Sequence, residues 1–285
     1  MISLCEKLLP ENGGVASLVG AGGKTTLMFR LARELADAGE TVLTTTTTKI
    51  FPPTEEQSVA VVIAEESADA LDKADDLLRT SLHVTIAREH LTSQGKLVGF
   101  APHIIDEFRR SGLFRWIIVE ADGAARRPLK APAAHEPVIP ECSDEVVAVV
   151  GLDAVGKPLN DQWVFRTGLY SQITGVPLNS PVTEQSIAQI ILDKDGLMRG
   201  CPSAARRVAF LNKAERKSTL GAGRRIASIL CAHNGGKPER IVVGSLLEES
   251  FFVKVYCPEV SEHGLKRSSD TTRTTPINEA YIEMS

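Results

Sequence analysis

The hydrophobic pattern of the chain predicts strands and helices that alternate. Short runs of apolar and β-branched residues predict strands, and between them apolar residues recur every three or four positions, as in helices that pack one face on a core. The expected strands cover 16–19, 41–50, 59–64, 116–119, 146–150, 207–211, 240–245 and 251–256. The expected helices cover 25–38, 67–80, a segment after Pro102, 166–173, 183–191 and 216–232. This order predicts an α/β fold with a mostly parallel sheet between helical layers.

Three segments depart from the alternation. Residues 83–88 and 96–100 flank a Thr-Ser-Gln-Gly turn, which predicts a hairpin. Residues 154–205 are less regular, and we interpret them as a helical insertion packed on the sheet of a single domain that spans 1–260. From Ser268 onward the chain is rich in Ser, Thr and Arg without apolar periodicity, so we expect 261–285 to form a poorly ordered tail.

A glycine-rich stretch follows the first expected strand and opens the first long helix. In such a stretch the backbone N–H groups of the loop and of the first helical turn bind phosphate, a lysine adds positive charge and a hydroxyl ligates Mg²⁺. The standard phosphate loop has a glycine where this chain has Leu18, so the loop is shorter or differently shaped. A glycine-rich turn with an exposed lysine is the alternative. The expected nucleotide contacts are Gly20, Ala21, Gly22, Gly23, Lys24, Thr25 and Thr26.

Two carboxylates end the expected strand 116–119. Glu120 and Asp122 come directly after this apolar run, with Gly123 behind them. Phosphate-loop enzymes use a carboxylate in this place to hold Mg²⁺ or to orient an attacking water. We therefore expect Lys24, Glu120 and Asp122 to be the catalytic groups, with Thr25 and Asp122 at the metal. An ordinary Asp-Gly turn is the alternative.

Basic residues follow within a proline-rich segment. Arg126, Arg127, Lys130 and His135 lie among prolines, which exclude a helix or a central strand and stiffen the loop. Lys49 ends a run of threonines that we place beside the phosphate loop, where ligands of parallel sheets bind. These five residues predict an anion or substrate site. A solvated basic loop, and threonines that serve only as strand residues, are the alternatives.

The strand expected at 207–211 leads into Asn212-Lys213-Ala-Glu215. GTPases read guanine with Asn-Lys-x-Asp at such a strand end, where the acid accepts hydrogen bonds that adenine cannot donate in the same way. Glu215 is one methylene longer, so guanine recognition requires a shifted geometry. Gly244 and Ser245 end the next expected strand and are placed to support the base.

Composition narrows the range of partners. The 285 residues carry a net charge of −4, which gives no electrostatic case for binding nucleic acid. The longest apolar run, 59–64, is too short to span a membrane, and the first residues lack a signal-peptide pattern. The five cysteines are dispersed without a C-x-x-C pair, which indicates reduced thiols and a cytoplasmic protein rather than disulfides or a zinc site.

These motifs together resemble the YqeC family. The resemblance covers roughly 12–255 and is carried by the phosphate loop, the threonines before Lys49, the Asn212-Lys213 pair and above all the stretch from Val119 to Pro140. It implies a phosphate-loop fold and an accessory role in maturing the cofactor of selenium-dependent molybdenum hydroxylases. Relatives often carry Asp where this chain has Glu215.

The combined prediction is a three-layer, P-loop NTPase-like α/β sandwich that binds and hydrolyses a nucleoside triphosphate with Mg²⁺, GTP slightly favoured over ATP. The family implies further partners: a molybdopterin- or selenium-containing small molecule, or a hydroxylase apoprotein. One alternative is a kinase or nucleotidyl transferase that acts on a small acceptor held by the basic loop. Another is a scaffold that delivers a cofactor under nucleotide control with little turnover.

Overall fold

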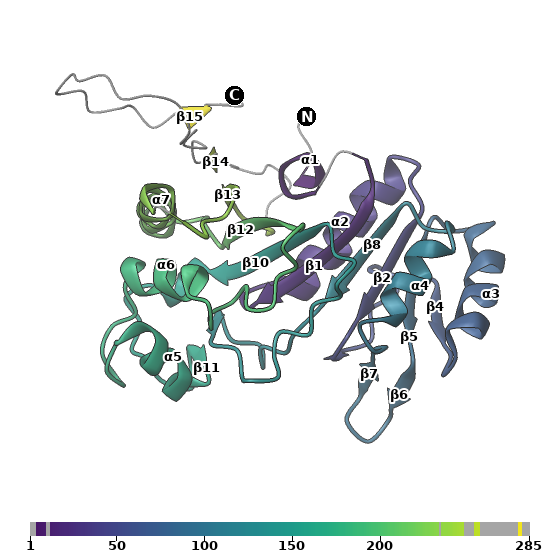
Figure 1. Ribbon diagram of the computed structural model, residues 1–285, viewed down its shortest axis with the longest axis horizontal. Helices are drawn as coiled ribbons and strands as arrows, with labels where there is room; N and C mark the ends of the chain where they lie inside the picture. Colours follow the sequence, from purple (N-terminus) through teal and green to yellow (C-terminus); the bar gives the residue numbers. More distant parts are fainter. Residues whose placement is uncertain (1–3, 10–11, 234, 248–253, 257–278, 281–285) are drawn as a thin grey trace.

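A ten-stranded sheet forms the middle layer of the protein (Figure 1). The structure is a computed structural model that describes residues 4–9, 12–233, 235–247, 254–256 and 279–280. The strands lie in the order β15 (Glu279–Ala280), β14 (Lys254–Tyr256), β13 (Arg240–Val243), β12 (Arg206–Asn212), β10 (Glu145–Gly151), β1 (Gly14–Gly20), β8 (Trp116–Glu120), β2 (Val42–Thr46), β5 (His83–Ala87) and β4 (Val61–Ile63). All neighbours from β13 to β4 pair parallel, whereas β14 and β15 pair antiparallel. The predicted mostly parallel sheet is therefore confirmed.

Helices cover both faces of this sheet. They are α1 (Leu4–Leu8), α2 (Lys24–Asp37), α3 (Ser67–Leu78), α4 (Ile104–Arg110), α5 (Thr167–Thr174), α6 (Glu184–Leu192) and α7 (Lys217–Ala232), with a single 3₁₀ turn, η1 (Leu152–Ala154). Side chains of a strand point alternately to its two faces, so each strand supplies two cores. In β1, Ala16 and Leu18 pack with α1 and α2, whereas Val15 and Val19 face the opposite layer. This arrangement confirms the α/β sandwich.

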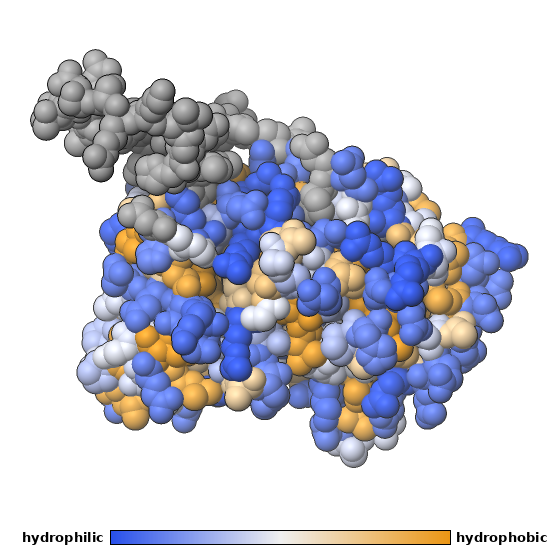
Figure 2. Space-filling model, in the orientation of Figure 1, coloured by the Kyte–Doolittle hydropathy of each residue, from blue (hydrophilic) through white to orange (hydrophobic). Residues whose placement is uncertain are grey.

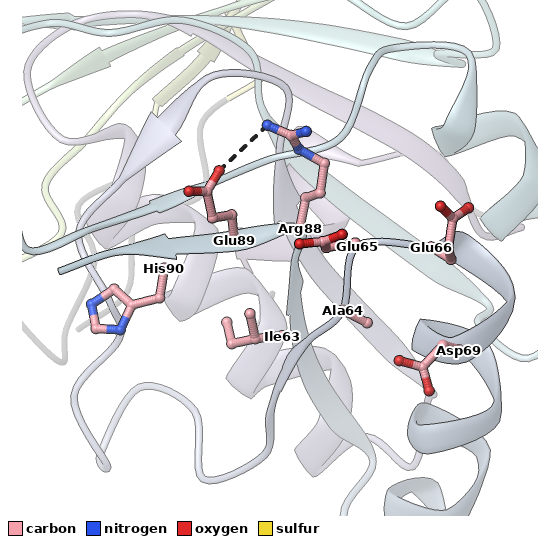
Figure 3. A pocket seen from close by; sticks show the side chains of 8 residues that line it. All are labelled: Ile63, Ala64, Glu65, Glu66, Asp69, Arg88, Glu89 and His90. Atoms are coloured by element: carbon pink, nitrogen blue, oxygen red, sulfur yellow. Dashed lines mark ion pairs between the residues drawn. The ribbon is translucent and has the colours of Figure 1, made fainter.

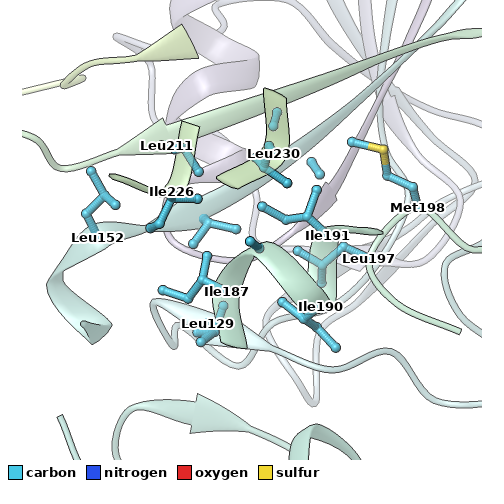
Figure 4. Packing of buried hydrophobic residues seen from close by; sticks show 14 of the residues in the cluster. Leu129, Leu152, Ile187, Ile190, Ile191, Leu197, Met198, Leu211, Ile226 and Leu230 are labelled. Carbon is cyan, nitrogen blue, oxygen red and sulfur yellow. The ribbon is translucent and has the colours of Figure 1, made fainter. Parts of the chain in front are cut away.

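The opposite layer is divided into two halves. The side chains of α3 and α4 pack over β2, β5 and β8. The other half contains α6 and α7, whose apolar side chains meet those of β10 and β12 (Figure 4). Ile187 and Ile190 of α6 share one core with Leu211 of β12, so this helix packs on the sheet.

Two small sheets lie outside the main one. In the first, β3 (Lys49–Ile50), β7 (Lys96–Val98) and β6 (Glu89–Leu91) pair antiparallel. In the second, β9 (Leu129–Lys130) pairs parallel with β11 (Val164–Phe165). The second pair brings the proline-rich loop next to the start of α5.

Two sequence expectations need correction, and a third falls almost wholly outside the described residues. The single strand expected at 41–50 is broken, because the Thr46 hydroxyl accepts the Thr48 N–H at 3.0 Å and turns the chain out of the sheet. In the hairpin, β7 pairs with β6, while the expected partner strand, β5, joins the main sheet. Of the expected tail, only Glu279–Ala280 is described, paired with β14; the rest of that prediction concerns residues outside the described ranges.

The predictions on membrane spans and cysteines can be compared with the structure only for the described residues. In the ranges that the structure describes, no helix has the length and apolarity needed to cross a membrane. Hydrophilic residues cover much of the face seen in Figure 2, with apolar residues scattered among them. Cys5, Cys142 and Cys201 are free thiols, as predicted; Cys257 lies outside the described residues.

Candidate functional site

The glycine loop lies at the carboxyl edge of the sheet, between the ends of β8 and β10. Gly20, Gly22 and Gly23 have φ angles of 90°, 85° and 128°, a region that side chains disfavour. A Cβ on Gly22 would lie 2.3 Å from the Gly151 nitrogen and 2.7 Å from the Pro128 carbonyl oxygen. Only glycine fits there, so the sequence of the loop is required by the close approach of its neighbours.

Lys24 is buried at the first turn of α2 and faces two carboxylates. Its ammonium donates to the Gly20 carbonyl at 2.8 Å and lies 3.0 Å from Asp122 Oδ1 and 3.6 Å from Glu120 Oε1. Burial alone would lower the pKa of Lys24, but the charges of Asp122 and Glu120 outweigh it and raise this pKa above its usual value. The lysine is thus held as a cation. Lys24 and Asp122 lie on the same side of the molecule, as the hypothesis of a phosphate-binding loop requires.

The hydroxyl of Thr25 joins the same group. It donates to Glu120 Oε2 at 2.7 Å. Burial raises the pKa of Glu120, although Lys24 and the Thr25 hydrogen bond oppose the shift. Two carboxylates and one hydroxyl therefore lie within a few ångströms of the lysine that a triphosphate would contact.

The amino end of α2 lies at this edge of the sheet. Gly23, the N-cap residue of α2, offers no side-chain cap, so the first N–H groups of this 14-residue helix remain for an anion. Among the described residues, no three His, Cys, Asp or Glu side chains gather into a complete metal cage. Mg²⁺ commonly binds one or two carboxylates together with substrate phosphates, so the oxygens of Thr25, Glu120 and Asp122 are a donor set of the kind that this ion accepts.

A buried chain of ion pairs leads away from Asp122. Asp122 Oδ2 accepts the Gly20 N–H at 3.0 Å and the Lys130 ammonium at 2.9 Å. Lys130 also donates to Glu136 Oε2 at 2.7 Å, and Arg166 binds both oxygens of Glu136. Partial burial would raise the pKa of Glu136, but the hydrogen bonds from Arg166 and Lys130 outweigh it and lower this pKa to about 2. We call Lys24, Asp122, Lys130, Glu136 and Arg166 the ion chain.

The end of β12 lies against the glycine loop. Asn212 donates through Nδ2 to the Gly22 carbonyl at 2.8 Å, while its buried Oδ1 has no hydrogen-bond partner. The Lys213 ammonium pairs with Asp153 Oδ2 at 2.7 Å, and the Ser245 hydroxyl donates to Glu215. Of the residues predicted to contact the base, Asn212 therefore contacts the glycine loop, whereas Lys213 and Glu215 pair with Asp153 and Ser245.

The predicted substrate cations do not form one cluster. Lys49 is exposed in β3 and reaches Gln94 at 3.4 Å. The guanidinium of Arg126 stacks over Phe51, 4.4 Å from the ring centroid, and Arg127 donates to the Asp161 carbonyl. Only Lys130 lies in the ion chain, and the exposed His135 has no contact that ties it to the group.

The threonines near Lys49 are engaged by the fold. Thr45, Thr46 and Thr47 each donate a hydroxyl hydrogen bond to a main-chain carbonyl, of Ile86, Glu120 and Val138. Strand β8 lies between β1 and β2, so this run adjoins the end of β8 rather than the glycine loop itself.

Three site residues escaped the sequence analysis: Asp153, Glu136 and Arg166. Glu136 lies in the proline-rich loop, but the prediction for this loop used only its basic residues. A carboxylate six residues after a lysine is a usable signal for Glu136. No local pattern marks Arg166, because its pairing depends on β9 and β11 meeting.

Three cavities open at different places on the molecule. One of about 380 Å³ opens beyond the ends of β4 and β5, where Glu65, Glu66, Asp69 and Glu89 gather near the single Arg88–Glu89 ion pair (Figure 3). Another of about 430 Å³ lies between the proline-rich loop and α5. A third of about 150 Å³ reaches Thr26. At the glycine loop itself, the Lys24 ammonium pairs with the carboxylates of Asp122 and Glu120.

The fold and this edge define a P-loop NTPase-like α/β sandwich. A family model described as "YqeC protein" matches residues 16–168. The chain is also 36% identical over 202 residues to "Uncharacterized protein YqeC" of Escherichia coli (strain K12), covering 70% of this chain and 75% of that protein. The chain belongs to the YqeC family.

Proposed function

We propose that this protein binds and hydrolyses a nucleoside triphosphate with Mg²⁺, with GTP favoured over ATP, during maturation of a selenium- or molybdenum-containing hydroxylase cofactor. The observation that carries the proposal is the Lys24 ammonium, 3.0 Å from Asp122 at the uncapped amino end of α2. The part that concerns the pathway rests on the family resemblance of the stretch from Val119 to Pro140.

The residues have distinct roles in this proposal. Lys24 and the N–H groups of the glycine loop bind the β- and γ-phosphates, and Lys24 then turns from the carboxylates to the phosphates. Thr25, Asp122 and Glu120 hold the metal directly or through water. Mg²⁺, when bound, neutralises charge on the phosphates. Most of the catalytic effect then comes from positioning and charge neutralisation.

The preference for GTP rests on the end of β12. Asn212 is fixed to the glycine loop through Gly22, which sets its distance from a bound triphosphate. Glu215 is oriented by the Ser245 hydroxyl, so its second oxygen is free to accept hydrogen bonds from a guanine edge.

One further function has support in a specific observation. The ion chain connects the glycine loop to Arg166, the residue that precedes α5. Such a connection suits a scaffold in which nucleotide binding changes the presentation of the helical insertion, with little turnover. Exposed residues such as Lys49, Arg126 and His135 would then contact the delivered cofactor.

Labelled nucleotide separates these functions. The protein is incubated with γ-³²P-GTP or γ-³²P-ATP and Mg²⁺, with and without a molybdopterin acceptor. Release of free phosphate supports hydrolysis, whereas label on the acceptor supports a kinase; α-³²P nucleotide tests nucleotidyl transfer in the same way. Tight binding without release supports the scaffold. Absence of nucleotide binding in every arm contradicts the whole proposal.

A further inference from the structure

Lys130 is an unusual residue because its ammonium is wholly buried. Its side chain is 0% exposed, although it belongs to a proline-rich loop near the surface. An ammonium has three N–H donors. They go to Asp122 Oδ2 at 2.9 Å, the Gly123 carbonyl at 2.5 Å and Glu136 Oε2 at 2.7 Å. The protein uses every donor, so none remains for a substrate.

The contacts of Lys130 fix the orientation of the Asp122 carboxylate. Oδ2 is held from two sides, by the Gly20 N–H and by Lys130. Oδ1 therefore faces Lys24, at 3.0 Å. If Lys24 turned to a phosphate, Oδ1 would lose this partner and would be available as a ligand for the metal of a bound nucleotide.

The outer end of the ion chain keeps Lys130 in place. Glu136 receives Lys130 on one oxygen and is bound on both by Arg166. Arg166 is partly exposed, with 21% of its side-chain surface accessible, and directly precedes α5. The order of charges is thus cation, anion, cation, anion, cation, from the glycine loop to the helical insertion.

We propose that Lys130 is a positioning residue for the metal: by holding Asp122 Oδ2, it presents Oδ1 to the Mg²⁺ that accompanies the triphosphate, and Glu136 anchors it. This inference rests on the proposed function. In this inference Lys130 sets how much Mg²⁺ the protein needs. It does not contact the substrate, and its ion pairs do more than stabilise the fold.

The first test removes both buried charges together. The double variant Lys130→Met/Glu136→Gln removes one cation and the anion paired with it, so neither is left buried without the other. Arg166 loses its carboxylate partner but is partly exposed, so water can solvate its guanidinium. We expect the Mg²⁺ concentration that half-saturates GTP binding to rise about tenfold or more, as on loss of an outer-shell partner of a metal ligand. GTP affinity in EDTA should change less than about twofold, because the phosphate contacts are intact.

A spectroscopic measurement checks the same point. Mn²⁺ replaces Mg²⁺, and its electron paramagnetic resonance is recorded in the presence of GTP. The signal of bound Mn²⁺ should appear at about tenfold higher metal concentration in the double variant. A Mg²⁺ or Mn²⁺ requirement equal to that of the wild type in a folded double variant overturns the inference.

Two further variants separate positioning from stability. Lys130→Arg keeps a cation with several donors, so it should restore the Mg²⁺ requirement to within about threefold of the wild type. Glu145→Gln removes a buried, arginine-paired carboxyl at the opposite edge of the sheet and should leave the Mg²⁺ requirement unchanged, whatever its effect on stability. A rise for Glu145→Gln equal to that of the double variant would show a general stability effect and overturn the inference.

The design also covers a misfolded double variant. In that case Glu136→Gln alone is measured, since Lys130 keeps its bond to Asp122 but loses its anchor. We expect a several-fold rise, about threefold, in the Mg²⁺ requirement, and no rise overturns the inference. Failure of the proposed function looks different, because the wild-type protein itself then binds no nucleotide at any Mg²⁺ concentration.

Discussion

Two regions of the molecule bury carboxylates against cations, at opposite edges of the same sheet. At the carboxyl edge, the ion chain joins the glycine loop, β8, the proline-rich loop and the start of α5. At the amino edge, Glu145 of β10 pairs with Arg206 of β12 at 2.7 Å, and the two residues are direct partners in the register. Here the second oxygen of Glu145 is buried without a hydrogen-bond partner.

The difference shows what each region is built for. A buried ion pair is weak evidence for stability, because desolvation can exceed the attraction. The pair at the amino edge illustrates this: burial raises the pKa of Glu145 to about 7, despite Arg206. At the carboxyl edge, two cations keep Glu136 ionised with a pKa of about 2. At the carboxyl edge, Glu136 thus stays ionised in the chain of ion pairs that leads to the uncapped amino end of α2.

The largest expected effect is that of Lys24→Ala. Nucleotide binding should fall by about a hundredfold or more, because the charge that faces the phosphates is lost. Stability should fall by about 3–5 kcal/mol, since Asp122 and Glu120 lose a buried partner. Isothermal titration with GTP and urea unfolding measure the two effects. Unchanged affinity in the folded variant would contradict the assignment of the loop.

The next effect concerns pH at the amino edge. The folded state holds a proton on Glu145 between pH 4.5 and about 7, whereas the unfolded chain releases it. The stabilising contribution is therefore complete below pH 4.5 and is lost as pH rises through 7, by on the order of 3 kcal/mol. Glu145→Gln should flatten this loss in urea unfolding between pH 5 and 8. A variant with the wild-type slope would show that Glu145 is not the group responsible.

Glu136 should show the opposite slope. Its folded-state pKa of about 2 lies below the ordinary 4.5, so its contribution is present above pH 4.5 and lost as pH falls toward 2. With solvent screening near the loop surface, the loss is about 1–2 kcal/mol. Acid unfolding of Glu136→Gln should be less steep than that of the wild type. Equal steepness would contradict the ionised state assigned to the carboxyl edge.

The smallest effect is expected at the end of β12. Glu215→Asp should raise the preference for GTP over ATP by about two- to tenfold, because the shorter acid restores the usual reach to guanine. Competition binding with the two nucleotides measures it. The same change at Glu239, which lies at the amino edge before β13, is the matched control. No difference between the two variants would mean that Glu215 does not contact the base.

Much of the fold could be predicted because its signals are local. The helix α2 and the strands β1, β8 and β10 are short periodic or apolar segments with clear ends, and parallel pairing follows from their alternation with helices. The break after Thr46 was missed because it depends on one hydroxyl bonding to a backbone N–H two residues on. The hairpin partner was misassigned because β5 is buried on both faces and suits the main sheet better.

The site was predictable where one strand end supplies several groups. Lys24 and Asp122 follow neighbouring strands, so their meeting could be expected from topology. The environment of Lys130 could not be predicted from the sequence. A lysine among prolines is usually solvated, and its burial depends on Glu136 and on Arg166, which approaches only when β9 pairs with β11.

A crystal structure with Mg²⁺ and a non-hydrolysable GTP analogue tests the central claim most directly. We predict the phosphates at the amino end of α2, the Lys24 ammonium moved from Asp122 to a phosphate oxygen, and the metal beside Thr25 and Asp122 Oδ1. A nucleotide bound elsewhere, with the 3.0 Å contact between Lys24 and Asp122 intact, would contradict it.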